Sequence, residues 1–289
     1  MLKIVEKTKI WFAMSLIIII IGMGFIATKG LNFGIDFKGG TSLTINMNQK
    51  YNKADVDKII DKHAKGEYVS KSLNDGKEID ITVKSDALTA DQTATMLKEI
   101  KTQFKSSSLI SENTIGASIG TELKSKAITA LIVAMIFMLV YVGFRFEFKF
   151  AAAAIIALIH DILITITVYA VFQITVNATF IAAILTVVGY SINDTIVIFD
   201  RIRENQKIMR KASIEDITNT SVTQTMARSI NTVATVLICI FSVYVFVPSI
   251  RELSFPLLFG IGVGCYSSIF IASPMWVLLK KRKKKITAK

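Results

Sequence analysis

The sequence predicts a membrane protein: an α-helical bundle of six transmembrane helices, with a small α+β ferredoxin-like extracytoplasmic domain between helices 1 and 2. Three observations predict this fold class. Hydrophobic residues make up 52% of the 289 residues, and the mean hydropathy is +0.52, which indicates a membrane protein. Six apolar segments have the roughly 20 residues needed to cross a bilayer. A long polar stretch separates the first segment from the second.

The first apolar segment is the one most easily mistaken for something else, because three lysines precede it as in a signal peptide. Its apolar run is long for a signal peptide, and no small-residue cleavage site precedes Lys29. We interpret it as an uncleaved anchor. The third segment is the least uniform, since it contains His160 and Asp161. The six predicted spans lie near residues 10–28, 127–144, 150–172, 178–199, 229–248 and 255–279.

The basic residues predict the orientation of the chain in the membrane. They precede span one, lie between spans two and three, and follow spans four and six, whereas the other short connections carry only Arg251. Lysine and arginine mark cytoplasmic connections, so both termini are expected in the cytoplasm of a multi-pass cytoplasmic-membrane protein. The same placement explains the net charge of +12 without a nucleic-acid partner. The predicted domains are 1–28 (N-terminus and helix 1), 29–125 (extracytoplasmic domain), 126–279 (helices 2–6) and 280–289 (basic cytoplasmic tail).

The polar stretch has the pattern of a small soluble domain. Leu43, Ile45 and Met47 alternate with polar residues, as in a strand with one buried face. Helices are expected over 54–64 and 89–104, and strands over 41–47, 67–73, 78–83 and 109–115. The triplet Asn74-Asp75-Gly76 predicts a hairpin turn between the two middle strands. The order β-α-β-β-α-β is that of a ferredoxin-like module. Three glycines, Gly34, Gly39 and Gly40, predict a tight turn where helix 1 meets this module.

Several functional classes have no support in the residues. There is no phosphate-binding or dinucleotide motif, since Gly39-Gly40 is too short. No cluster of histidines, cysteines and acids has metal-ligand or catalytic spacing. Cys239 and Cys265 lie in apolar segments and are interpreted as small buried residues, and His63 is interpreted as a solvated residue of a polar helix face. We therefore expect no cofactor, no metal and no enzymatic activity.

Asn193 and Asp194 stand out because they lie inside the fourth apolar segment. A carboxylate near the middle of a bilayer costs at least a few kcal/mol, and such residues usually serve proton relays or ion pathways. The alternative is a carboxylate that only joins helices through hydrogen bonds. The residues alone leave both uses open.

The fifth segment supplies a basic counterpart, Arg228. It runs antiparallel to the fourth, so Arg228 is expected to enter from the same side and at a depth comparable to Asp194. Asn231, three residues on, shares its helix face. Burial favours the neutral acid and a nearby guanidinium favours the charged one, so a movable Asp194–Arg228 pair would couple protonation to helix displacement. The alternatives are a static ion pair and an arginine that extends to the membrane surface.

Asp161 is a second candidate for proton coupling. It is expected either to join the polar interior or to pair with a neighbouring subunit, and His160 is not expected to face it, because adjacent helix residues point apart. The charges at 200–204 are expected to set the end of the fourth helix. The last span combines a small-residue face with a kink at Pro274 and an interfacial anchor at Trp276. That face contains Gly260, Gly262, Gly264, Ser267 and Ser268.

Taken together, these motifs resemble the SecF family, the smaller membrane subunit of the SecDF accessory complex of bacterial protein export. The matching segments are 34–40 with its glycines, His160-Asp161, 188–205, 228–231 and 272–274. The resemblance implies a six-helix repeat of the RND superfamily that pairs with SecD. It further implies that the pair assists the SecYEG channel and the SecA motor, using the proton-motive force to move translocating polypeptide. By position, Asp194 and Arg228 match the intramembrane acid and arginine associated with proton transport.

Two other functions are kept as alternatives. One is an RND-type proton-coupled exporter of small molecules or lipids, although a domain of this size is small for a drug-binding porter. The other is a scaffold whose ionisable residues only hold helices together. The residues do not distinguish a proton from a sodium ion as the coupling species.

Overall fold

The chain folds into two compact units. The fold is taken from a computed structural model that describes residues 2–64, 68–73, 76–84 and 88–286. The helical unit comprises Met1–Asn32, Thr129–Thr175 and Thr179–Lys289, and the sheet unit comprises Phe33–Ile128 and Val176–Ala178. Each unit has its own hydrophobic core.

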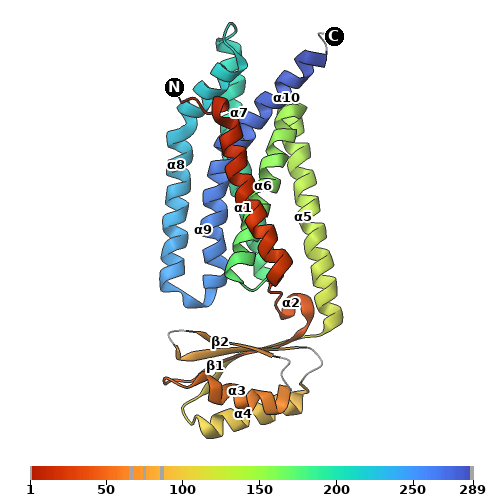
Figure 1. Cartoon of the computed structure of the whole chain (residues 1–289), viewed down its shortest axis with the longest axis vertical. Helices are drawn as coiled ribbons and strands as arrows, with labels where there is room; N and C mark the ends of the chain where they lie inside the picture. The colour runs from red at the N-terminus through yellow and green to blue at the C-terminus, as the bar shows by residue number, and fades with distance from the viewer. Residues whose placement is uncertain (1, 65–67, 74–75, 85–87, 287–289) are drawn as a thin grey trace. The chain divides into compact units, whose positions relative to one another are not determined.

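Six helical stretches in the described part of the chain are long and apolar enough to cross a membrane, as predicted. The first five contain α1 (Thr8–Lys29), α5 (Ala117–Arg145), α6 (Phe148–Phe172), α7 (Ala178–Ile208) and α8 (Ile214–Phe246). The sixth consists of α9 (Arg251–Ser267), a π-helical turn (Ser268–Ala272) and α10 (Ser273–Ile286). Figure 1 shows these helices as one bundle within the helical unit. The last three residues of the predicted basic tail, 287–289, lie outside the described residues.

Several helices extend past the apolar segments that predicted them. Helix α7 continues two turns beyond Asp200 to Ile208, so the charges at 200–204 do not end the helix, contrary to expectation. Asp200 instead pairs with Arg203 and Arg145. Helix α8 begins well before its apolar stretch, because Ser213 caps it by accepting a hydrogen bond from the backbone N–H of Asp216 at 3.0 Å.

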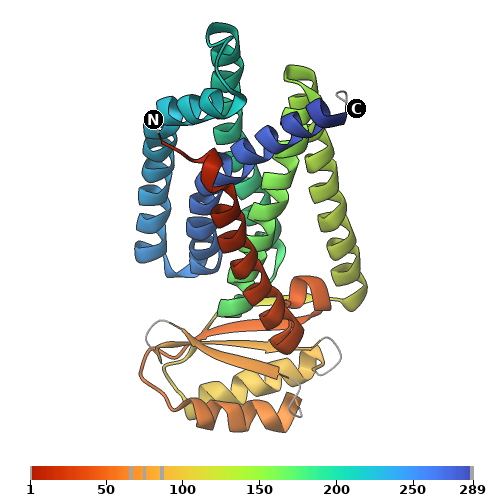
Figure 2. The ribbon, with the colours of Figure 1, turned by 45° about the horizontal axis from the view of Figure 1, so that its top comes forward.

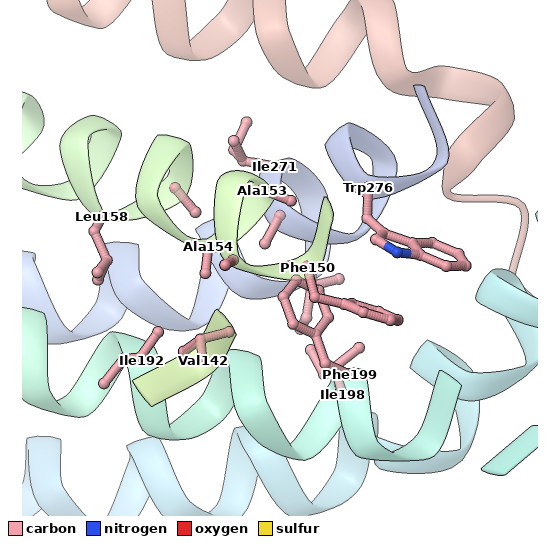
Figure 3. Close-up of a cluster of buried hydrophobic side chains, with 14 of the residues drawn as sticks. Val142, Phe150, Ala153, Ala154, Leu158, Ile192, Ile198, Phe199, Ile271 and Trp276 are labelled. Carbon is pink, nitrogen blue, oxygen red and sulfur yellow. The ribbon is translucent and has the colours of Figure 1, made fainter. Parts of the chain in front are cut away.

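Two helices, α6 and α7, are largely covered, whereas α5 and α8 are not. In the most apolar segment of each helix, 61% of α6 and 50% of α7 is buried inside the protein, compared with 6% of α5 and 6% of α8. Aromatic rings pack together in the core, where Trp276 stacks on Phe150 with ring centroids 4.7 Å apart and Phe150 contacts Phe199 (Figure 3). Trp276 is 0% exposed, so the interfacial anchor expected there is wrong: its ring fills the core.

Two of the three glycines on the predicted small-residue face allow α9 to approach α7 closely. A Cβ at Gly260 would lie 2.3 Å from Val187, and one at Gly264 would lie 3.0 Å from Ser191. Gly262 points to open space instead. The small-residue face is therefore narrower than predicted and is made by Gly260 and Gly264.

The kink predicted near Pro274 is present, and a π-helical turn accompanies it. Because Pro274 has no N–H, it cannot continue the helical ladder. The preceding residues widen into the π turn, and Ser273 Oγ donates to the carbonyl of Ser268 at 2.9 Å. Helix α10 then departs from the direction of α9 (Figures 1 and 2). Such π turns occur frequently at functional sites.

The sheet unit contains one four-stranded antiparallel sheet in the order β2-β3-β1-β4. Its elements follow one another as β1 (Gly40–Asn46), α3 (Lys53–Ala64), β2 (Tyr68–Leu73), β3 (Glu78–Val83), α4 (Ala90–Gln103) and β4 (Ser108–Ile115). Both helices lie on the same face of the sheet (Figures 1 and 2). Leu43, Ile45 and Met47 are buried between sheet and helices, as their alternation predicts. Residue 67 and the first two residues of the predicted hairpin turn lie outside the described residues; Gly76 has a φ of +83°.

The predicted glycine turn contains a four-residue helix, α2 (Ile35–Lys38), followed by two glycines that no other residue could replace easily. Gly39 and Gly40 have φ values of +75° and +139°, which residues with a side chain rarely adopt. A Cβ at Gly39 would also lie 2.7 Å from the backbone of Ala117. The turn therefore depends on glycine for both conformation and space.

Candidate functional site

The centre of the helical unit contains a buried acid, Asp161, whose carboxylate joins three helices. It lies on α6 and is 0% exposed. Its Oδ2 accepts hydrogen bonds from Ser191 of α7 at 2.5 Å and from Ser267 of α9 at 2.7 Å. Its Oδ1 is 2.9 Å from Nδ1 of His160. Of the two placements expected for Asp161, the structure shows the polar interior of its own bundle.

A second layer of hydroxyls continues this network at the start of the π turn. Ser268, the first residue of the π turn, shares a hydrogen bond of 2.7 Å with Thr195 of α7. The single O–H of Ser268 lies within donating distance of the carbonyl oxygens of Ser191, at 3.2 Å, and Gly264, at 2.9 Å. We refer to Asp161, His160, Ser191, Thr195, Ser267 and Ser268 as the polar hub. From the sequence, Ser267 and Ser268 were expected only as part of the small-residue packing face. Ser191 and Thr195 are four residues apart on α7, and this spacing places them on one helix face.

His160 contradicts the expectation that it would not face Asp161. The two residues are adjacent on α6, and rotation of the imidazole side chain brings Nδ1 to the carboxylate in spite of the diverging backbone directions. The ring lies beside Tyr266, with centroids 6.1 Å apart. Within the described residues, His160 Nε2 has no hydrogen-bond partner.

Asp194 is also buried, at 7% exposed, but its surroundings are different. It lies against Ser229 of α8 and Cys265 of α9, and it is within electrostatic reach of Arg228. Only part of the carboxylate lacks a partner: in the part of the chain described, Asp194 Oδ2 and Ser229 Oγ are both buried without a well-formed hydrogen bond. An unsatisfied buried polar group costs about 1–3 kcal/mol, and more when charged. Asp194 is therefore the buried acid whose hydrogen bonding is incomplete.

The other predicted site residues lie on the outside of the helical unit. Arg228 and Asn231 are exposed on α8, and Asn193 is exposed on α7. Arg228 influences Asp194 through space and does not hydrogen-bond to it. Asn193 borders a shallow pocket of about 340 Å³, lined along one face of α7 by Thr186, Gly189, Tyr190 and Asn193. The structure thus brings Arg228 near Asp194 without direct contact. Ser229, not singled out from the sequence, is the α8 residue that touches the acid.

In the sheet unit, His63 and Glu99 form a pair that links helices α3 and α4. His63 is not simply solvated as expected, because its Nε2 lies 2.8 Å from Glu99 of α4 and its side chain is 18% exposed. Together with Lys62, it lowers the pKa of Glu99 below the usual range of a glutamate through hydrogen bonds. Within the described residues, no group of three or more His, Cys, Asp or Glu side chains could hold a metal ion.

The fold and the site define a polytopic membrane protein with ionisable groups inside its helix bundle and a small antiparallel sheet unit. Two family models match this chain: protein export membrane protein SecD/SecF, C-terminal, over residues 93–282, and the SecD/SecF GG motif over residues 24–50. Protein translocase subunit SecF of Sebaldella termitidis is 36% identical, covering 98% of this chain and 93% of its own length. The Pseudomonas aeruginosa SecF is 37% identical, over 93% and 88% of the two chains. The chain belongs to the SecF family.

Solved structures agree with this assignment. The crystal structure of SecDF from Thermus thermophilus, a translocon-associated membrane protein, has a TM-score of 0.88 and 30% identity over 97% of this chain. A SecDF structure in a super-membrane-facing form has a TM-score of 0.73 and 31% identity over 99% of this chain. This chain spans 39% and 40% of the lengths of those two SecDF chains.

Proposed function

We propose that this chain is an accessory subunit of the Sec protein translocase that pairs with SecD and uses the proton-motive force to promote late steps of polypeptide export. The observation that carries the proposal is the unsatisfied, buried carboxylate of Asp194 beside a helix that carries Arg228. The names of the relatives, protein translocase subunit SecF, support the role in export.

Proton coupling requires a group that changes charge and a neighbour that responds to the change. With its unpartnered Oδ2, ionised Asp194 is poorly stabilised, so a proton or the approach of Arg228 would each relieve it. Taking up a proton would weaken the attraction to Arg228, and losing it would strengthen that attraction. Alternation between the two states would move α8 relative to α7, and Asn193 and Asn231 would offer polar contacts along the way. One charge crossing 100 mV supplies about 2.3 kcal/mol.

Pairing with SecD is supported by the polar residues that α7 and α8 leave uncovered. Arg228, Asn231 and Asn193 are exposed on membrane-spanning helices, and such residues are costly against lipid. A second helix bundle would cover them, whereas the apolar surface of α5 suits membrane lipid directly. The chain matches less than half of each solved SecDF chain, which leaves room for a SecD half in the complete assembly.

The remaining parts of the proposal concern orientation and partners. The sheet unit has the element order and strand order of a ferredoxin-like fold, and we place it outside the cytoplasm with both termini inside, on the basis of the charged connections. There it would meet translocating polypeptide. The SecYEG channel and SecA are proposed as partners from the resemblance to SecF.

The test is proton flux in vesicles that contain this chain together with its SecD partner. We expect a flux that depends on the membrane potential and that falls on the order of 100-fold in Asp194→Asn, because the carrier is lost. Asp200→Asn is the matched control: it removes an acid of the same helix that is paired at the polar end, and it should leave the flux unchanged. A flux that survives Asp194→Asn would contradict the proposal. Export of drugs or lipids in place of polypeptide would favour an RND-type exporter.

A further inference from the structure

We infer that Asp161 is a positioning residue: through the polar hub it fixes the rotation of α7 and thereby the direction in which Asp194 points. The inference rests on the proposed role of Asp194 and deepens it. It assigns Asp161 a role other than the proton carrier expected from its residue type.

Both carboxylate oxygens of Asp161 are already engaged by neighbouring side chains. Ser191 and Ser267 donate to Oδ2 at 2.5 and 2.7 Å, His160 Nδ1 lies 2.9 Å from Oδ1, and the side chain is 0% exposed. A carboxylate accepts such bonds only while it keeps its lone pairs available. Adding a proton to Oδ2 would force Ser191 or Ser267 to turn away. A group enclosed in this way is suited to hold helices together and poorly suited to exchange protons.

The hydroxyl side chains of the hub are short, so they require helices α7 and α9 to lie close together. Serine can bridge two helices only if their backbones are close, and Gly264 provides that approach, since a Cβ there would lie 3.0 Å from Ser191. Ser268 adds bonds to Thr195 and to the carbonyl of Ser191. Helices α7 and α9 are therefore fixed at two successive levels, four residues apart on α7.

Asp194 lies on α7 between Ser191 and Thr195, the two residues that the hub holds. Residues 191 and 195 lie on one face of α7, and residue 194 lies about 100° from 195, given 3.6 residues per turn. With that face fixed toward α6 and α9, Asp194 must point toward Ser229 and Cys265. Residue 193 then points outward, as its exposure shows. Loosening the hub would let α7 rotate, so Asp194 would spend less time facing Ser229 and Cys265, and the flux would fall while its pH midpoint still reports the facing orientation.

The titratable and charged groups near each acid determine which of the two acids sets the pH dependence of proton flux. On its own helix Asp161 faces His160, which lies beside Tyr266 of α9, and α7 contributes the hydroxyl of Ser191. Asp194 faces Cys265 on α9, with the charge of Arg228 on α8. If Asp161 only positions Asp194, the pH midpoint of proton flux belongs to Asp194 and stays in place when the hub is weakened.

The test uses Cys265 as a reporter of the environment of Asp194. In a Cys239→Ser background, the complex with SecD is labelled in membranes with a permeant maleimide, and the proton flux is measured on the same vesicles. We expect Ser267→Ala and Asp161→Asn to raise the labelling rate of Cys265 several-fold and to reduce the flux without moving its pH midpoint. Ser242→Ala is the matched control, because within the described residues that hydroxyl bonds to the carbonyl of Ile238 on its own helix and to no other group. Both readouts should stay at the parental level.

Two results would overturn the inference. One is an unchanged labelling rate of Cys265 in both hub variants. The other is a flux that stops or shifts its pH midpoint in Asp161→Asn while Ser267→Ala behaves like the parent, which would make Asp161 a carrier. An absence of flux in the parental complex would refute the proposed function instead, and the labelling rates would still decide whether the hub positions α7.

Discussion

Asp161 and Asp194 are the same residue type, lie in neighbouring helices of one bundle and are both almost fully buried, yet their surroundings are opposite. Asp161 has a partner on every side, supplied by α6, α7 and α9. In the part of the chain that the structure describes, Asp194 has one oxygen without a hydrogen-bond partner, and Arg228 acts on it only through its charge. The difference shows that burial alone does not identify a working acid. The hydrogen bonds that are made, or left unmade, separate a structural carboxylate from one that is poised to change.

The comparison predicts unequal effects of one substitution at the two sites, and this is the largest difference in stability that we expect. Asp161→Asn should destabilise the protein by about 3 kcal/mol, since an amide cannot accept all the bonds that the charged group accepts. Asp194→Asn should change stability by less than about 1 kcal/mol, because it removes the charge from an unsatisfied site. Denaturant unfolding of the purified complex measures both. Equal losses at the two positions would remove the distinction.

The seam between α7 and α9 offers a matched pair of glycines for the next test. Gly260→Ala should cost about 2 kcal/mol, because its Cβ would meet Val187 at 2.3 Å and force the helices apart. Gly262→Ala, on the same helix but facing open space, should stabilise the helix by up to about 1 kcal/mol. Thermal unfolding of the two variants side by side checks the sign. If both behave alike, the close approach that the hub requires is not present.

Serines next to the two acids give a smaller and equally specific contrast. Ser267→Ala removes a bond to Asp161 and should cost about 1 kcal/mol, a usual value for a hydrogen bond inside a membrane protein. Ser229→Ala removes a buried hydroxyl that lacks a well-formed hydrogen bond within the described residues and should be neutral or slightly stabilising. Unfolding midpoints under one set of conditions are sufficient. A greater loss in Ser229→Ala would mean that Asp194 is better satisfied than the structure shows.

An exposed acid outside the bundle provides the smallest effect and a baseline. The pKa of Glu99 is lowered by hydrogen bonds to His63 and Lys62, so this group stabilises the fold above the ordinary glutamate pKa. That contribution is lost as the pH falls through the lowered value. Glu99→Gln should therefore make stability slightly less dependent on pH in the acidic range, measured by unfolding across a pH series. An unchanged pH dependence would show that the pair is fully screened by solvent.

Much of the fold follows from patterns that the sequence carries openly. Six apolar runs and the alternation around Leu43 predict helices and strands because burial in lipid or in a core selects residues by face. Helix ends were harder to predict, as α7 shows: its polar extension to Ile208 has no apolar period to mark it. Trp276 was misplaced because tryptophan suits both a membrane interface and a core, and only the position of Phe150 decides between them.

The candidate site could be predicted in its charges but not in its connections. A buried acid stands out in an apolar run, so both Asp161 and Asp194 were found. Serine and glycine do not stand out in that way, and the hub depends on which helix faces serve as neighbours. That arrangement is set by side chains far apart in sequence, such as Ser191 and Ser267, which no local pattern relates.

The most direct measurement is difference infrared spectroscopy of the complex with SecD, following the carbonyl stretch of protonated carboxylic acids as the pH or the membrane potential changes. The account predicts one such band that disappears in Asp194→Asn and remains, at the same pH midpoint, in Asp161→Asn. A band that persists without Asp194, or that is lost with Asp161 alone, would contradict it.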